Sequence, residues 1–62
     1  MNWTPVTIRE LRTGLHLTQE QFAHRLGVTV GAVQRWERGG AAPSPMAVRN
    51  LDGLAVHTEA ES

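Results

Sequence analysis

Residues 19–38 read QEQFAHRLGVTVGAVQRWER, and this stretch decides the fold. The pattern predicts two short helices joined by a turn at Gly27-Val28. Two helices that meet at a steep angle need a small residue where they approach, a residue tolerant of positive φ at the corner, and an aliphatic residue in the angle. Ala23, Gly27 and Val33 supply these three at the required spacing. We therefore expect a paired-helix unit whose second helix presents its outer face to a partner.

Capping residues give the limits of the two central helices. Thr18 and Gln21 have the capping-box spacing, in which a hydroxyl and an amide satisfy unpaired backbone N–H groups at the helix start. Gly27 ends this helix in the left-handed conformation that glycine adopts without strain. Thr29 caps the next helix, which Gly39 follows.

The sequence on each side of this helix pair predicts one further helix. Thr4-Pro5 and Ser44-Pro45 both place a capping hydroxyl before a proline that suits the first helical position. Gly14 is the expected end of the first helix. The expected core residues are Ile8, Leu11, Leu15, Phe22, Ala23, Leu26, Val33, Trp36, Met46, Val48, Leu51 and Leu54. The predicted fold is a compact all-α bundle of four helices, with four to five allowed, because the central pair cannot bury its apolar faces alone.

Trp3 precedes the first cap and has two alternative roles. It could staple onto Ile8, one turn into the helix, or stack on a nucleotide base. We expect the staple, which is the usual role of an apolar residue at this position.

The charge of the chain is unevenly distributed. The sequence has six arginines and six acidic residues, a formal net charge of 0, but Asp52, Glu59 and Glu61 all lie in the last eleven positions. The first 51 residues therefore carry six arginines against three glutamates, a net charge of +3. The planar guanidinium suits phosphates or a guanine edge, although the same charges could serve solubility alone. We expect a domain over 1–56 and a mobile, acidic tail over 57–62.

Several classes of protein are not supported by the sequence. There is no cysteine, no apolar run long enough to span a membrane and no signal-peptide pattern, so we expect a soluble cytoplasmic protein. His16, His24 and His57 lack metal-ligand spacing. A core this small leaves little room for a catalytic cleft. We expect no enzyme activity, no metal and no cofactor, and no small-molecule substrate is evident.

The segment LTQEQFAHRLGVTVGAVQRWERG, followed by PSP, resembles the helix-turn-helix DNA-binding family of phage Cro and repressor proteins, also called XRE-like. The resemblance covers roughly residues 6–54. Its markers are the LTQ entry, Ala23, Leu26-Gly27-Val28, the cap Thr29, Val33, the WERG exit and the PSP that follows. The resemblance implies a lambda-repressor-like bundle that binds double-stranded DNA.

What the family implies falls on particular positions of this chain. Base contacts are expected from the start and outer face of the helix at about 29–38, namely from Thr29, Val30, Gly31, Gln34 and Arg35. The family implies a phosphate contact from Gln19, and we also expect phosphate contacts from Thr18 and from Arg38, which lies at the end of the helix. The glutamate of the exit motif commonly pairs with an arginine of the first helix, which implies a structural ion pair between Arg12 and Glu37.

The side chains on the outer face of the helix at about 29–38 indicate which bases it could contact. Arg35 suits a bidentate contact with guanine and Gln34 a contact with adenine, while Val30 or Ala32 could meet a thymine methyl. Gly31 lowers helix stability by about 1 kcal/mol relative to alanine. A glycine at position 31 would be explained by a close approach of the backbone to DNA. The alternative is a modest sequence specificity that depends on DNA shape, and we favour this second explanation.

The expected function is that of a small transcriptional regulator, a repressor by preference. Such a domain covers one half-site, so we expect a homodimer on a palindromic operator, with the last helix and the C-terminal residues as its interface. Alternatives with the same fold are a protein-interaction or adaptor module and an antitoxin-type autoregulator.

Overall fold

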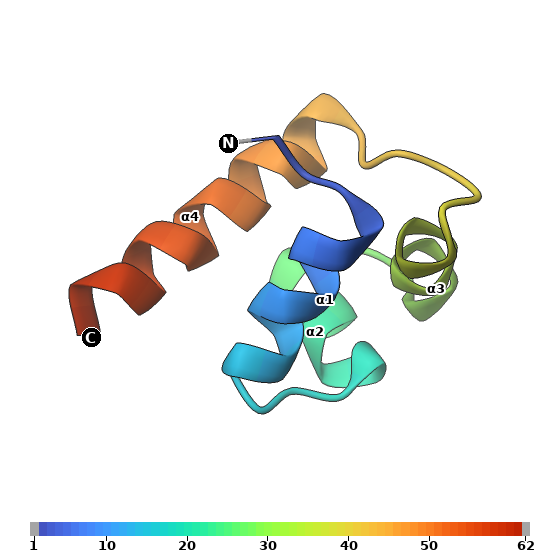
Figure 1. Ribbon diagram of the computed structural model, residues 1–62. Coiled ribbons are helices and arrows are strands. Elements are labelled where there is room, and N and C mark those ends of the chain that lie inside the picture. Colours follow the sequence, from blue (N-terminus) through green and yellow to red (C-terminus); the bar gives the residue numbers. More distant parts are fainter. Residues whose placement is uncertain (1, 62) are drawn as a thin grey trace.

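The computed structural model describes residues 2–61, and it describes side chains as far as Val56. Four helices follow one another: α1 (Pro5–Gly14), α2 (Gln19–Leu26), α3 (Val30–Arg38) and α4 (Pro45–Glu61). Figure 1 shows α1, α2 and α3 gathered together, with the long α4 running along one side. The described residues contain no strand and no fifth helix. The predicted all-α bundle is confirmed.

The helices begin where the sequence predicts. Thr18 accepts a hydrogen bond from the backbone N–H of Gln21 at 3.1 Å, and its own N–H donates to the Gln21 side-chain oxygen at 2.9 Å, which completes the capping box. Thr29 accepts from the N–H of Ala32 at 3.1 Å. Thr4 and Ser44 cap α1 and α4 in the same way.

The first three helices also end where the sequence predicts. Gly27 and Gly39 adopt the left-handed conformation, with φ of 71° and 81°, at the ends of α2 and α3. α1 ends at Gly14, as predicted, and the residue in the left-handed conformation beyond it is His16, with φ of 59°. The N–H groups of His16 and Leu17 then donate to the carbonyls of Thr13 and Arg12, at 3.0 and 3.2 Å, which closes the last turn.

The core lies between the central pair and its two covering helices. α2 packs against α3, α1 covers α3, and α4 covers α2. The buried apolar residues are Ile8, Phe22, Ala23, Leu26, Val33, Trp36, Ala47 and Leu51. Leu11, Leu15, Val48 and Leu54 are half-buried.

The prediction that Met46 closes the core is wrong. Its side chain is 71% exposed, and Ala47 is 2% exposed in its place. Ala47 and Leu51 share one face of α4 because they stand four residues apart, and a small residue lets the start of α4 approach the bundle.

Two side-chain hydrogen bonds hold α4 in place. The indole N–H of Trp3 donates to Asp52 at 2.8 Å, and the Asn50 amide donates to the carbonyl of Leu26 at 3.1 Å. Trp3 is half-buried against the core cluster that contains Ile8, so it has the structural role expected of it. The predicted mobile tail over 57–62 lies outside the residues whose side chains are described. Over the described residues, every helix is too short or too polar to cross a membrane.

Candidate nucleic-acid interface

The two edges of α3 have opposite environments. Val33 and Trp36 are 0% and 5% exposed and form part of the core. Gln34 and Arg35 lie on the other edge and are exposed, together with Arg38 at the end of the helix. The structure therefore places the predicted reading side chains on the solvent side of a helix that is held along its apolar edge.

The beginning of α3 is more apolar than its middle. Val30 is 38% exposed, and Gly31 is half-buried. A Cβ atom added at Gly31 would meet only the Thr29 hydroxyl, at 3.9 Å, which is ordinary van der Waals contact. The packing of the free protein therefore does not require glycine at this position.

The residues predicted to contact phosphates lie close to the reading edge. Gln19, Gln34 and Arg38 line a shallow hollow of about 300 Å³ between the start of α2 and the outer edge of α3. Thr18, the residue before α2 in the sequence, is also exposed. Its hydroxyl oxygen accepts the capping hydrogen bond, so its O–H can still donate to a second partner. An arginine and polar groups that both donate and accept therefore converge on one concave surface.

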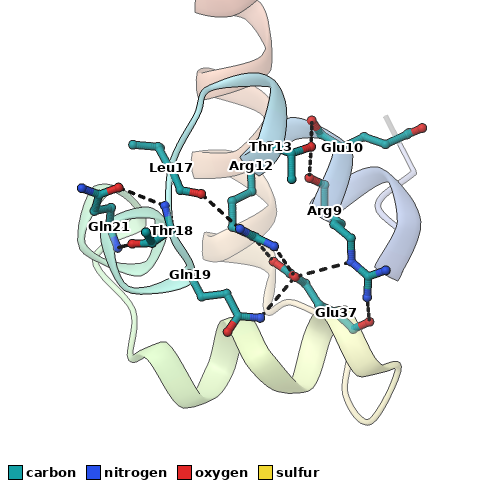
Figure 2. A network of polar contacts seen from close by, with 9 residues as sticks. All are labelled: Arg9, Glu10, Arg12, Thr13, Leu17, Thr18, Gln19, Gln21 and Glu37. Atoms are coloured by element: carbon teal, nitrogen blue, oxygen red, sulfur yellow. Dashed lines mark hydrogen bonds and ion pairs between the residues drawn. The ribbon is translucent and has the colours of Figure 1, made fainter.

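Glu37 lies on the inner side of α3 and connects three helices (Figure 2). The Arg12 guanidinium donates to both oxygens of its carboxylate, with Nε to Oε2 at 2.7 Å and Nη2 to Oε1 at 3.1 Å. The Gln19 amide donates to Oε1 at 3.3 Å. The Glu37 side chain is 3% exposed and that of Arg12 is 17% exposed. The Arg12–Glu37 ion pair that the resemblance implies is therefore present, and it fixes α3 against α1 and the start of α2.

The ionised form of Glu37 is the stable one in this setting. Burial by itself would raise the pKa of the carboxyl. Hydrogen bonds from Arg12 and Gln19, together with the positive charges of Arg12 and Arg9, outweigh it and lower the pKa below its ordinary value of 4.5. Because the carboxylate is turned inward and neutralised, α3 presents arginines and no exposed acid on its outer side.

Two partners of Glu37 were not predicted from the sequence. Arg9 donates to the backbone carbonyl of Glu37 at 3.2 Å, and its Nε lies 3.7 Å from the carboxylate. Gln19 was predicted as a phosphate contact, and it is half-buried with its amide directed to Glu37. Arg9 and Arg12 stand three residues apart, so they share a face of α1, and this spacing was the available signal.

Comparison with known proteins gives the family. A helix-turn-helix family model matches residues 8–52, which is most of the chain and includes α2, the turn and α3. The chain belongs to the helix-turn-helix family of the Cro and phage-repressor type. This is a family of DNA-binding regulators and not of enzymes.

One relative of this helix-turn-helix chain is the HTH-type transcriptional activator BcrR of Enterococcus faecalis. The two are 46% identical over 37 residues, which is 60% of this chain and 18% of BcrR. The chain thus spans less than a fifth of that relative's length. No solved structure matches the chain.

No group of three or more histidine, cysteine or acidic side chains within the described residues is placed to hold a metal ion. The side chains that the structure does bring together at the surface of the helix-turn-helix unit are Gln19, Gln34 and Arg38, with Arg35 beside them on α3. Their chemistry is that of hydrogen bonding and charge.

Proposed function

We propose that this chain binds double-stranded DNA through the exposed edge of α3, inserted in the major groove, and that it is the DNA-binding part of a transcriptional regulator. The observation that carries the proposal is the division of α3 between a buried edge, with Val33 and Trp36, and an exposed edge, with Gln34 and Arg35. A helix of about 10–12 Å diameter fits the major groove of B-DNA, about 12 Å wide.

Two kinds of contact make up the proposed interface. Arg35 donates in a bidentate manner to a guanine edge, and Gln34 pairs with adenine, while Thr29, Val30 and Gly31 bring the start of α3 against neighbouring bases. Thr18, Gln19 and Arg38 bind phosphates on either side of the groove. The family to which the chain belongs supports both assignments.

The buried ion pair has a positioning role in this interface. Glu37 joins α3 to Arg12 and also takes a hydrogen bond from Gln19, so the reading helix and a phosphate-binding residue are held in one fixed relation. Neither Arg12 nor Glu37 needs to touch DNA for this.

We further propose that two copies bind a palindromic operator as a homodimer. The molecule is 31 Å long in its greatest dimension, less than one turn of DNA of about 34 Å, so one copy reaches one half-site. Met46 and Val56 are 71% and 65% exposed on α4, which supports this helix as the interface between copies. Repression by occupying the operator is the simplest mode. BcrR is named an activator, so a reporter assay decides the direction of regulation.

Salt dependence tests DNA binding against the alternatives. If arginines bind phosphates, log K falls linearly with log salt concentration and the slope is steep. A protein-interaction module shows no such slope with DNA. An antitoxin-type autoregulator also binds DNA, and it differs in recognising the promoter of its own operon. Mobility-shift titrations on random-sequence duplexes from 50 to 200 mM salt, on the order of physiological strength, therefore support the proposal if the slope is steep and refute it if binding is flat or absent.

A further inference from the structure

The side chain of Arg9 projects from α1 onto the last turn of α3. Its Nη2 donates to the backbone carbonyl of Glu37 at 3.2 Å, and its Nε lies 3.7 Å from the Glu37 carboxylate. Glu37 directly precedes Arg38, the last residue of α3. These two contacts hold a cation of α1 beside the end of the proposed reading helix.

The Glu37 carboxylate does not need the charge of Arg9. Arg12 already donates to both of its oxygens, at 2.7 and 3.1 Å, which is the strong bidentate arrangement. Arg9, Arg12 and Glu37 together carry two positive charges and one negative charge, a net charge of +1. The side chain of Arg9 is 58% exposed and that of Arg12 is 17% exposed, so the surplus positive charge lies at the surface on Arg9.

The N–H groups of Arg9 are only partly used within the protein. A guanidinium has several N–H donors in a planar fork. In the described part of the chain that of Arg9 makes a hydrogen bond only to the Glu37 carbonyl. This carbonyl belongs to the last turn of α3, where carbonyls lack partners inside the helix and the helix dipole is negative. Arg9 therefore offsets the negative end of α3, which would otherwise repel a phosphate, and its Nη1 group can still donate to one.

The position of Arg9 relative to Gln19 favours a phosphate as its partner. Figure 2 shows Gln19 and Arg9 on opposite sides of Glu37, with Gln19 at the start of α2 and Arg9 on α1. Gln19 also lines the hollow that it shares with Gln34 and Arg38. A helix seated in the major groove has a phosphate backbone along each side. Gln19 and Arg9 both flank α3, so both can reach such a backbone.

We propose that Arg9 is a further phosphate contact of this domain, beside the end of α3. The inference rests on the proposed function, since it requires α3 to lie in the major groove. Arginine suits the contact because its fork donates to phosphate oxygens and its charge releases a condensed counterion. The contacts with Glu37 orient the side chain before DNA binds, which lowers the entropy cost of ordering it.

Salt dependence of DNA binding tests this contact directly. Arg9→Gln removes one charge and keeps an amide that can donate a hydrogen bond. In mobility-shift titrations on a random-sequence duplex, its slope of log K against log salt should be shallower than the native slope by about 0.9. The loss of affinity between about 50 and 200 mM salt then becomes about 3.5-fold smaller. Arg9→Lys keeps the charge and should keep most of the native slope.

Arg25→Gln is the matched control for the change in net charge. Arg25 is exposed in the last turn of α2, six residues from Gln19 and on a different face of that helix, so its loss should leave the slope unchanged. A measurement on the native chain supplements the variants. The Nε–H signal of Arg9 in the ¹⁵N-labelled protein should shift and exchange more slowly with water when duplex is added. This signal decides the matter even if Arg9→Gln does not fold.

The outcomes separate this inference from the proposed function. A steep native slope that Arg9→Gln retains, or an Arg9 signal that duplex does not change, refutes the Arg9 contact and leaves DNA binding by α3 intact. An equal reduction of the slope in Arg25→Gln also refutes it, because net charge alone would then explain the effect. A flat native slope refutes both. A shallower slope in Arg9→Gln, with native slopes in Arg9→Lys and Arg25→Gln, supports the contact.

Discussion

Replacing Arg12 with methionine should remove a large part of the stability of this domain. The substitution keeps an apolar stem of similar length and deletes the guanidinium that donates to both oxygens of Glu37 and to the carbonyl of Leu17. The Glu37 carboxylate, 3% exposed, would keep only the Gln19 amide at 3.3 Å and the more distant Arg9. A buried charge would then be left largely uncompensated.

The magnitude follows from this geometry. Removing one partner of a buried ion pair destabilises a protein by about 3–5 kcal/mol. Native domains are stable by roughly 0.05–0.15 kcal/mol per residue, which is about 3–9 kcal/mol for 62 residues. The loss is therefore a large fraction of the whole free energy of unfolding, and Arg12→Met should unfold at a much lower urea concentration than the native chain.

Urea denaturation followed by circular dichroism measures the effect. The control is the double variant Arg12→Met with Glu37→Met, which removes both charges and should recover most of the lost stability, since an apolar pair of similar volume often replaces a buried ion pair at little cost. A loss below about 1 kcal/mol in Arg12→Met, or a double variant no more stable than the single one, would refute the reasoning.

The pH dependence has a defined sign. In the native chain the pKa of Glu37 is lowered, so the ion pair contributes its full stability above the ordinary pKa of 4.5, and this contribution is lost as the pH falls through the folded-state pKa. In Arg12→Met burial dominates and raises the pKa, so acidification should lessen the penalty of that variant. Stability curves of the two proteins that run parallel below about pH 5 would contradict this account.

Three further predictions concern single positions. His16→Gly should raise the free energy of unfolding by about 1 kcal/mol, because His16 has a φ of 59°, and a decrease in thermal denaturation temperature would contradict it. Gly31→Ala should stabilise α3 by up to about 1 kcal/mol, because its Cβ meets only Thr29 at 3.9 Å. If the DNA affinity of Gly31→Ala nevertheless falls sharply, the backbone at position 31 approaches DNA closely, and modest specificity does not explain this glycine. Arg38→Ala should weaken binding to all sequences alike and reduce the slope of log K against log salt by about 1, and an unchanged slope would remove Arg38 from the phosphate contacts.

Most of the helix limits could be predicted because they depend on local chemistry. Thr18 and Gln21 satisfy the first N–H groups of α2 within one turn, and Gly27 ends it, so the relevant residues are neighbours in the sequence. The two edges of α3 also follow from helical spacing, which puts Val33 and Trp36 on the side opposite Gln34.

The contacts between helices could not be predicted in the same way. Met46 is more apolar than Ala47, but α4 turns the face with Ala47 and Leu51 toward the bundle, and Met46 lies outside that face. Arg9 and Gln19 meet at Glu37 because three helices cross there, so their partners depend on crossing geometry. The Arg12–Glu37 pair was predicted from the family resemblance, and helical periodicity alone would not have predicted it.

The most direct test of DNA reading by α3 is selection of bound duplexes from a random pool with the native chain and with Arg35→Ala. The native chain should enrich one motif, and the variant should lose the preference at a guanine position of each half-site, at about 1–3 kcal/mol, while its fold and general DNA affinity remain. The same motif with the same guanine preference in both selections, or no enrichment by the native chain, would contradict the assignment of Arg35 and of the exposed edge of α3.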